Sequence, residues 1–347
     1  MMDTSQPLVS VVTPVYNGAK YLVECIESVL SQTYQNWEYI IVNNCSTDAT
    51  LEIAEKYAAS ERRIRVVTNS SFVNVIENHN IGFRLISKES EYCKIVCADD
   101  WIYPECLSRM VEVGEKHPSA AVIGAYVVSS RGVTLAGLPV GKSIFSGYDV
   151  CRSHLFGGPE VMGAPSAVLY RSEVIRKRED FFPGTAPSAD AAVYYEILRD
   201  WDFGFVHQIL SFERVHDEAL SGGQRQLHAF LLDKIAFLKR YAGAYGTPEE
   251  QSERFRQLMN EYYGTLATAL VHRYPRSYWD YHQKRLSEVG LSIEGSRLAR
   301  ALVTKALNLI LNPKRAYARF FHASEKRWRP SFSLPRIASE EQPNQAP

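Results

Sequence analysis

The sequence predicts an α/β protein with a mixed, mostly parallel central sheet and a helical C-terminal extension. Four short apolar runs, rich in β-branched residues, are typical of buried strands and cover residues 8–13, 37–42, 64–68 and 92–97. Apolar residues recur at helical spacing after each run. Alternating units of this length favour a parallel sheet with helices on both faces and right-handed crossovers.

The helices between these strands have recognisable starts. We expect the first over residues 22–30, where apolar residues recur on one face. The polar cluster at residues 46–48 is a natural N-cap for the second. The third is expected over residues 75–86, and the fourth begins at Pro104, a residue suited to the first helical turn.

The alternation loosens in the second part of the chain. Residues 121–129 and 166–170 are predicted as strands, residues 189–198 as a helix, and residues 203–215 as a strand or a hairpin. From Leu227 the pattern is helical almost to the end.

A domain boundary is expected near Gly222 and Gly223, whose polar surroundings look like a linker. We therefore predict a first domain over residues 1–223 whose halves meet at about residue 120, since a chain of this size exceeds one simple core. A helical extension over residues 224–338 and a disordered tail over residues 339–347 would follow.

Composition excludes several classes of protein. The 39 basic and 39 acidic side chains cancel, so there is no overall field suited to nucleic acid. The six cysteines lack CxxC pairs and Cys/His ligand spacing, which argues against a zinc site. The first residues lack the pattern of a secretory signal, and there is no run of about twenty apolar residues, so we expect a cytoplasmic protein.

Polar and acidic residues follow the predicted strands, at residues 13–18, 43–48 and 98–100. Ligands of such sheets bind beyond the carboxyl ends of the strands. Asp99 and Asp100 are adjacent carboxylates at one such end, a pattern suited to Mg²⁺ or Mn²⁺ and, through the cation, to a diphosphate. The alternative is that the pair caps the helix beginning at Pro104.

The chain resembles the family 2 glycosyltransferases. The segment VSVVTPVYNGAKYLVECIESVLSQTYQNWEYIIVNNCSTDAT matches that family's first strand, first helix and second strand, and HNIGF and ADDWIYP follow at the expected intervals. A weaker resemblance continues through SADAAVYYEILRDWDFGFVHQILSFERVHDEALS. The resemblance implies a Rossmann-like GT-A fold, with a first half that binds a nucleotide sugar and a second half that binds the acceptor.

The resemblance also implies a nucleotide pocket at the edge of the sheet. Asn43 stands where the family usually has an aspartate that recognises the nucleobase, and His79 stands where it commonly has arginine, near the diphosphate. The residues expected at the pocket are Thr13, Pro14, Tyr16, Asn17, Asn43, Asp48, His79, Asn80 and Asp99.

Asp99, Asp100 and His216 are the metal ligands that the resemblance implies. One of the two aspartates is expected to contact ribose and the other the metal, and the assignment between them is open. His216 would return to the metal and diphosphate from the later segment; the alternative is a surface imidazole between Arg214 and Asp217.

Asp190 is implied as the general base that deprotonates the acceptor hydroxyl in an inverting transfer. At a helix N-terminus its ionised form should be stabilised, so we expect it to accept a proton at neutral pH. The alternative is a helix-capping carboxylate, and Ser188 could equally be the cap.

Three residues depart from the family pattern: Asn43, Cys97 and Ala189 stand where many relatives have acidic residues. They motivate an alternative, a catalytically degenerate nucleotide-sugar-binding module of the same fold. A sugar-nucleotide pyrophosphorylase fits less well, because TPVYNG supplies one glycine and no basic residue, and a dinucleotide oxidoreductase would need GxGxxG after the first strand.

Partners are expected at both ends of the reaction: a nucleotide-sugar donor, with UDP favoured because the Asn43 carbonyl can accept the uracil imide hydrogen, and a saccharide or lipid-linked saccharide acceptor. By analogy the setting is polysaccharide biosynthesis.

Residues 297–329 carry nine Lys and Arg against Glu325 alone, with apolar residues in a roughly helical rhythm. This favours either peripheral contact with an anionic membrane or a helix packed on the protein with a basic outer face.

Overall fold

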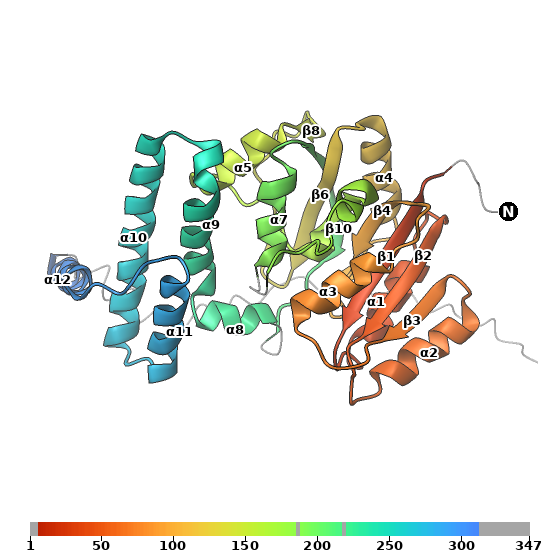
Figure 1. Cartoon of the computed structure of the whole chain (residues 1–347), viewed down its shortest axis with the longest axis horizontal. Coiled ribbons are helices and arrows are strands. Elements are labelled where there is room, and N and C mark those ends of the chain that lie inside the picture. Colours follow the sequence, from red (N-terminus) through yellow and green to blue (C-terminus); the bar gives the residue numbers. More distant parts are fainter. Residues whose placement is uncertain (1–5, 185–187, 217–219, 312–347) are drawn as a thin grey trace, which may run out of the picture.

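The structure is a computed structural model that describes residues 6–184, 188–216 and 220–311. Figure 1 shows a sheet with its covering helices, coloured red to green, and a group of helices, teal to blue, beside it. The disordered tail expected over residues 339–347, and the part of the basic stretch beyond Leu311, lie outside the described residues.

The predicted mostly parallel sheet is confirmed. In the described part of the chain it has ten strands in the order β3-β2-β1-β4-β9-β6-β10-β5, with β7 beside β6 and β8 beside β10. Strands β3, β2, β1 and β4 are parallel neighbours, β6 and β10 are parallel, and β9 runs antiparallel between β4 and β6. The strands are β1 (Leu8–Val15), β2 (Trp37–Asn43), β3 (Ile64–Thr68), β4 (Ser90–Ile95), β5 (Trp101–Ile102), β6 (Ala120–Ser129), β7 (Gly132–Thr134), β8 (Ile144–Phe145), β9 (Val168–Arg171) and β10 (Asp202–Phe212).

Helices cover both faces of this sheet and form the C-terminal extension (Figure 1). Their bounds are α1 (Leu22–Leu30), α2 (Thr50–Ser60), α3 (Val75–Arg84), α4 (Cys106–Lys116), α5 (Gly147–Leu155), the 3₁₀ turn η1 (Pro165–Ala167), α6 (Ser172–Arg176), α7 (Ala189–Ile197), α8 (Leu220–Gln226), α9 (Ala229–Tyr245), α10 (Pro248–Val271), α11 (Arg276–Ser287) and α12 (Gly295–Leu311).

Successive side chains of a strand point to opposite faces, and the core of the sheet follows this rule. In β1, Val11 belongs to an apolar cluster with α1 and α4, and Val12 belongs to the cluster on the other face, with α3, α5 and α7. Both side chains are fully buried. Because β1 is parallel to β2 and to β4, the carboxyl ends of these three strands meet at one edge of the sheet. The polar residues that follow the strands in sequence lie at that edge.

Several predicted boundaries were wrong. Helix α4 begins at Cys106 and not at Pro104, because Trp101 and Ile102 pair with β10 and keep the chain extended before a turn. Strand β9 begins at Val168, after the 3₁₀ turn that Pro165 opens. Of the two alternatives for residues 203–215, a strand or a hairpin, the structure has the strand, β10, which ends at Phe212.

The expected linker around Gly222 and Gly223 lies inside the short helix α8. Glycine costs a helix only about 1 kcal/mol relative to alanine, so two glycines do not prevent a short helix from forming here. The domain boundary itself stays a prediction.

The C-terminal extension has an apolar core of its own, formed by α9, α10, α11 and the inner face of α12. His282 of α11 is fully buried in it: its Nε2 lies 3.0 Å from the carbonyl of Leu227 and its Nδ1 lies 2.9 Å from the hydroxyl of Tyr262. A carbonyl can only accept, so Nε2 carries the proton and Tyr262 donates to Nδ1.

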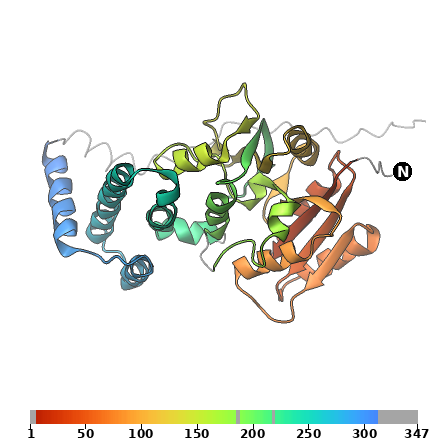
Figure 2. The same cartoon turned by 45° about the horizontal axis from the view of Figure 1, so that its top comes forward.

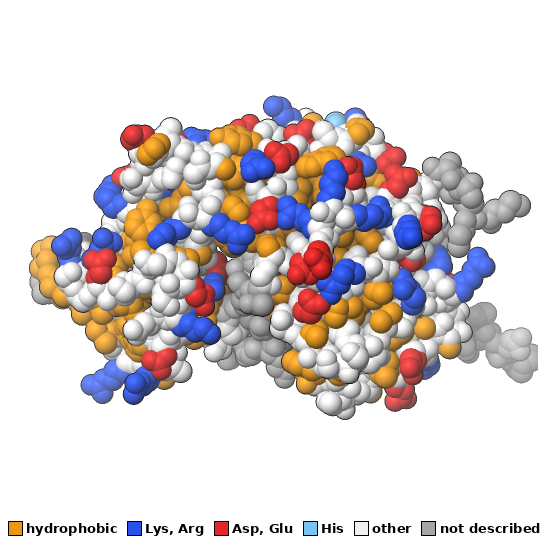
Figure 3. All heavy atoms as spheres, viewed as in Figure 1, with side chains coloured by type: hydrophobic (Ala, Val, Ile, Leu, Met, Phe, Trp, Pro, Cys, Tyr) orange, Lys and Arg blue, Asp and Glu red, His pale blue; other side chains and the backbone are white. Residues whose placement is uncertain are grey.

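Helix α12 lies at the far end of the extension, away from the sheet (Figure 2). Leu298 and Ala301 pack against the core of the extension, while Val303, Leu307 and Leu311 are 58%, 50% and 73% exposed. Figure 3 shows hydrophobic side chains at this end, with charged side chains beside them. No helix in the described ranges has the length and apolar character needed to cross a membrane.

Candidate active site

Asp99 and Asp100 follow β4 but lie in different environments. Asp100 is 5% exposed, and its Oδ1 accepts the backbone N–H of Arg214 at 2.9 Å. Burial, followed by the charge of Asp99, raises the pKa of Asp100 to about 7. The Asp99 side chain is 32% exposed, and its Oδ2 lies 3.0 Å from Nε2 of His216. Asp99 is therefore the more accessible carboxylate of the pair.

The segment after β10 folds back over these aspartates and brings His216 to them across 117 residues of sequence. Arg214 anchors it: its Nε donates to the carbonyl of Asp99 at 3.0 Å, and its guanidinium forms an ion pair with Glu24 and lies 4.3 Å from the ring centre of Tyr21. The His216 ring also lies against Tyr21, with the ring centres 5.3 Å apart. Glu24 of α1 and Tyr21, the N-cap residue of that helix, therefore hold the returning segment in place.

Asp99 and His216 fit a divalent cation that a ligand also coordinates. Within residues 6–184, 188–216 and 220–311, no group of three or more His, Cys, Asp or Glu side chains could hold a metal by itself. Mg²⁺ in nucleotide enzymes is commonly held by one or two carboxylates plus substrate phosphates and water. Nε2 of His216 donates to Oδ2 of Asp99 in this contact, because a carboxylate only accepts, and Nδ1 is buried without a hydrogen-bond partner among the described residues.

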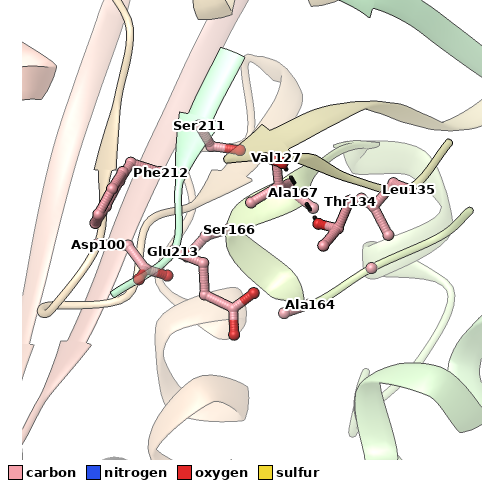
Figure 4. Close-up of a pocket in the computed structure, with 11 residues that line it drawn as sticks. Asp100, Val127, Thr134, Leu135, Ala164, Ser166, Ala167, Ser211, Phe212 and Glu213 are labelled. Carbon is pink, nitrogen blue, oxygen red and sulfur yellow. Dashed lines mark hydrogen bonds between the residues drawn. The ribbon is translucent and has the colours of Figure 1, made fainter. Parts of the chain in front are cut away.

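A small pocket, partly open to solvent, is lined by Asp100 and Glu213. Figure 4 shows the side chains of Asp100 and Glu213 side by side on one wall and η1, with Ser166 and Ala167, behind them. The Ser166 hydroxyl accepts the N–H of Cys97 at 2.9 Å, which fixes the turn that carries the two aspartates. Burial raises the pKa of Glu213, and Arg225 opposes this shift.

Thr13 and Pro14, expected at the nucleotide pocket, are buried within β1. The hydroxyl of Thr13 donates to the carbonyl of Val96 at 2.8 Å and lies 2.8 Å from the hydroxyl of Tyr39. Thr13 thus joins β1 to its neighbours β4 and β2.

Tyr16 stands at the surface of the same edge. Its side chain is 49% exposed and meets Phe72, which is 61% exposed, edge to face with ring centres 4.8 Å apart. Asn17 has a positive φ of 49°, and its Oδ1 accepts the N–H of Thr47 at 2.8 Å. This bond ties the β1–α1 loop to the β2–α2 loop.

Asn43 and Asp48 are engaged within these loops. Asn43 is 1% exposed; its Oδ1 accepts the N–H of Ser46 at 3.2 Å, and its Nδ2 donates to Thr68 at 3.3 Å. The oxygens of Asp48 accept the N–H groups of Thr50 at 3.0 Å and Ala19 at 3.1 Å. Burial acts to raise the pKa of Asp48, but a hydrogen bond from the Thr50 hydroxyl, together with those two N–H groups, prevails and lowers it.

His79 and Asn80 are both buried in α3. Asn80 makes two hydrogen bonds to the backbone of Phe182, at 2.9 and 3.0 Å, and so holds that later segment against α3. Nδ1 of His79 lies 2.8 Å from the carbonyl of Val75, whereas its Nε2 is buried without a partner in the described part of the chain. Burial lowers the pKa of His79, so the neutral ring offers Nε2 as an acceptor, which suits a hydroxyl and not a phosphate oxygen.

Asp190 lies in the first turn of α7. We expected the helix N-terminus to keep it ionised, but burial dominates and raises its pKa to about 7, while the backbone N–H of Ala191 opposes the shift. The loop around Gly163 connects the pocket with α7. Gly163 lines the pocket together with Asp100, and its carbonyl accepts a hydrogen bond from the hydroxyl of Tyr194, one turn beyond Asp190, at 3.1 Å.

Sequence reasoning brought together Asp99, Asp100 and His216, and the structure has them in contact or adjacent. It did not identify Phe72, Ser166, Glu213 or the anchoring role of Arg214. Phe72 is an apolar residue in a polar loop after β3, and Glu213 and Arg214 are charged residues that directly follow a buried strand. Those two patterns could have indicated them.

Part of the chain matches a known protein family. Residues 10–178 match the sequence model of glycosyl transferase family 2. An uncharacterized glycosyltransferase of Haemophilus influenzae is 30% identical over 191 residues, which are 53% of this chain and 58% of that protein. The chain thus spans little more than half the length of this relative.

Two solved structures share the fold. TarS 1–349 of S. aureus, in complex with UDP-GlcNAc, aligns with a TM-score of 0.58 and 15% identity over 81% of this chain and 80% of that one. The mannosyltransferase PcManGT of Pyrobaculum calidifontis, in complex with GDP-Man and Mn²⁺, aligns with a TM-score of 0.51 and 16% identity over 94% and 88%. The expected GT-A type fold is confirmed.

Proposed function

Because its N-terminal domain, over residues 10–178, belongs to the family 2 glycosyltransferases, we propose that this chain is an inverting glycosyltransferase. It transfers a sugar from a nucleoside-diphosphate donor, UDP-linked, to a hydroxyl of a saccharide or lipid-linked saccharide. The observation that carries the proposal is the contact of Asp99 with His216 at 3.0 Å, at the sheet edge where nucleotides bind.

The donor's nucleobase would lie at the exposed pair of Tyr16 and Phe72. Aromatic faces stack on any base, so discrimination must come from polar groups nearby. The Asn43 carbonyl accepts one hydrogen bond from Ser46 and has a second lone pair. Because the side chain is 1% exposed, contact with the uracil imide N–H would require the loop to open, so the uridine assignment rests on the position of Asn43 in the family pattern. In the structures compared above, TarS holds UDP-GlcNAc and PcManGT holds GDP-Man.

Asp99 and His216 would hold the divalent cation, Mg²⁺ or Mn²⁺, together with the diphosphate. The cation would offset the charge that develops on the departing nucleoside diphosphate. Asp100, with one oxygen bound to the backbone of Arg214, would keep the returning segment in register with Asp99.

Asp190 would act as the general base. With a pKa of about 7 it is ionised in about half of the molecules at pH 7, the condition under which proton transfer from an acceptor hydroxyl is most effective. No enzyme nucleophile is required for inversion, since the acceptor oxygen attacks the anomeric carbon as the diphosphate departs from the opposite face.

A lipid-linked acceptor would place the enzyme at an anionic membrane surface. The outward face of α12 supports this, since Val303, Leu307 and Leu311 are exposed beside Arg297 and Arg300. Such a helix binds through its apolar face and its basic flanks.

A donor panel tests the proposal. Binding of UDP, GDP and dTDP is measured by calorimetry with and without Mn²⁺, and release of the nucleotide from UDP-, GDP- and dTDP-sugars is followed with water as acceptor. We expect UDP to bind best and Mn²⁺ to strengthen it. Guanosine or thymidine diphosphate binding at least about tenfold tighter would reject the uridine assignment. Tight binding without release of nucleotide under any condition would favour the noncatalytic binding module.

A further inference from the structure

Lys94 of β4 is a fully buried lysine that lies shortly before Asp99 in sequence. Lysine is almost never fully buried unless its amine is paired. In the described part of the chain, Nζ of Lys94 donates to two backbone carbonyls, that of Ser166 at 2.7 Å and that of Val168 at 3.1 Å. Burial lowers the pKa of Lys94, but the ammonium and the neutral amine both have the N–H groups for these bonds. The two contacts therefore do not depend on the charge of Lys94.

The two carbonyls belong to the segment that enters β9. Strand β9 runs antiparallel to β4, and Lys94 opposite Leu169 is the last residue pair of their ladder. The chain before β9 forms η1, which lies beyond the end of this ladder. The amine of Lys94 reaches from the last pair to the carbonyl of Ser166, within η1. The side chain thus attaches η1 to β4 where the pairing of the two strands ends.

A further hydrogen bond leads from η1 to the acid pair. Ser166 is 4% exposed, and its hydroxyl accepts the N–H of Cys97 at 2.9 Å. The carbonyl of Cys97 in turn accepts the N–H of Asp100 at 2.9 Å, which closes the turn that carries both aspartates. Ser166 and Asp100 also line the same pocket (Figure 4). Three hydrogen bonds, through Ser166 and Cys97, therefore connect the amine of Lys94 with the backbone of Asp100.

We propose that Lys94 is a positioning residue for the acid pair and that it acts through Ser166. The inference rests on the proposed role of Asp99, which holds the cation together with His216. Without the amine, two buried carbonyls lose a donor, and because unpaired buried polar groups are costly, η1 would shift toward other donors. The Cys97 turn is bonded to η1 and would move with it, so Asp99 would be displaced relative to His216.

The test is the Mn²⁺ dependence of UDP binding to the full chain with Lys94→Met, measured by calorimetry. Methionine has nearly the length of lysine but no N–H group. Partners that orient metal ligands contribute roughly 10- to 100-fold to metal affinity, so we expect Mn²⁺-dependent binding of UDP to weaken at least about tenfold. Binding of UDP without Mn²⁺ should be unchanged, because the nucleotide loops are not bonded to η1.

Tyr92→Phe is the matched control. Tyr92 is fully buried in the same strand and, two residues from Lys94, points to the same face of the sheet. Its hydroxyl donates to Glu115 at 2.7 Å, a bond that does not involve η1. This variant should lower the melting temperature and keep the Mn²⁺ dependence of the wild type.

Wild-type Mn²⁺ dependence in a Lys94→Met protein that melts at a lower temperature would reduce Lys94 to a support of the sheet and overturn the proposal. Equal losses of UDP binding with and without Mn²⁺ would overturn it as well. If thermal melting shows that Lys94→Met is unfolded, Ser166→Ala removes the hydroxyl bonded to Cys97 and keeps the carbonyl bonded to Lys94. It should show a similar loss of Mn²⁺-dependent binding, and wild-type affinity would reject the inference.

The double variant Lys94→Met/Ser166→Ala tests the route of the effect. Residues that act through one chain of hydrogen bonds are not additive, so the double variant should lose little more Mn²⁺-dependent binding than Lys94→Met alone. Losses that add would show that Lys94 does not act through Ser166 and would reject the inference. If UDP binding to the wild type does not respond to Mn²⁺, the proposed cation site fails and the inference with it. If the wild type responds and the variants match it, only the inference fails.

Discussion

The pKa of about 7 at Asp190 predicts how activity depends on pH. The base must be ionised to accept a proton, so the rate follows its ionised fraction. For a pKa of about 7 that fraction is about one tenth at pH 6 and about nine tenths at pH 8, so kcat/KM should rise about tenfold across this interval. Had the helix N-terminus dominated, the carboxyl would be ionised throughout and the profile would be flat there.

The assay is release of UDP from a saturating and a limiting UDP-sugar between pH 5.5 and 9, beside calorimetric binding of UDP at each pH. Asp190→Asn keeps the shape and one acceptor oxygen but removes the basicity. We expect it to lower the rate by a factor on the order of 10² and to abolish the rise between pH 6 and pH 8, without changing UDP affinity. The reasoning is refuted if the variant keeps the rising limb, or if its lost rate is matched by lost UDP binding.

Three further outcomes are expected. First, burial lowers the pKa of His282 from 6.5 to about 4. As the pH falls through this range, the unfolded chain binds a proton at His282 that the folded chain does not bind. The free energy of unfolding, from urea titrations, should decrease by up to about 3 kcal/mol between about pH 6.5 and about pH 4, and an unchanged value would show that the site is not closed to water. Second, Asp99→Asn should weaken Mn²⁺-dependent UDP binding at least about tenfold, measured by calorimetry; a larger loss in Asp100→Asn would reassign the ligand. Third, Val303→Ser/Leu307→Ser should reduce flotation with anionic liposomes while leaving neutral liposomes unaffected, and equal recovery with the wild type would leave α12 as a packed helix only.

Local sequence patterns determined most of the sheet. The run at residues 64–68 was predicted with its observed bounds, and the first helix was likewise predicted at Leu22–Leu30, because β-branched residues favour strands and an amphipathic helix requires its 3.6-residue period. Boundaries failed where a partner far away in sequence intervened: the pairing of Trp101 with Phe212 delays α4, and no pattern local to residues 101–106 contains that information.

The sequence by itself also determined which residue types meet at the sheet edge, because the ends of parallel strands converge whatever the side-chain details. Only the tertiary structure decided what each of them can do. Asp99 and Asp100 are identical neighbours, yet one is accessible to His216 and the other is buried against the backbone of Arg214. Asp190 has the helix N-terminus that its sequence predicts, yet burial raises its pKa to about 7. Solvation and charge act through distances in space, and residues far apart in the chain set those distances only when the fold is complete.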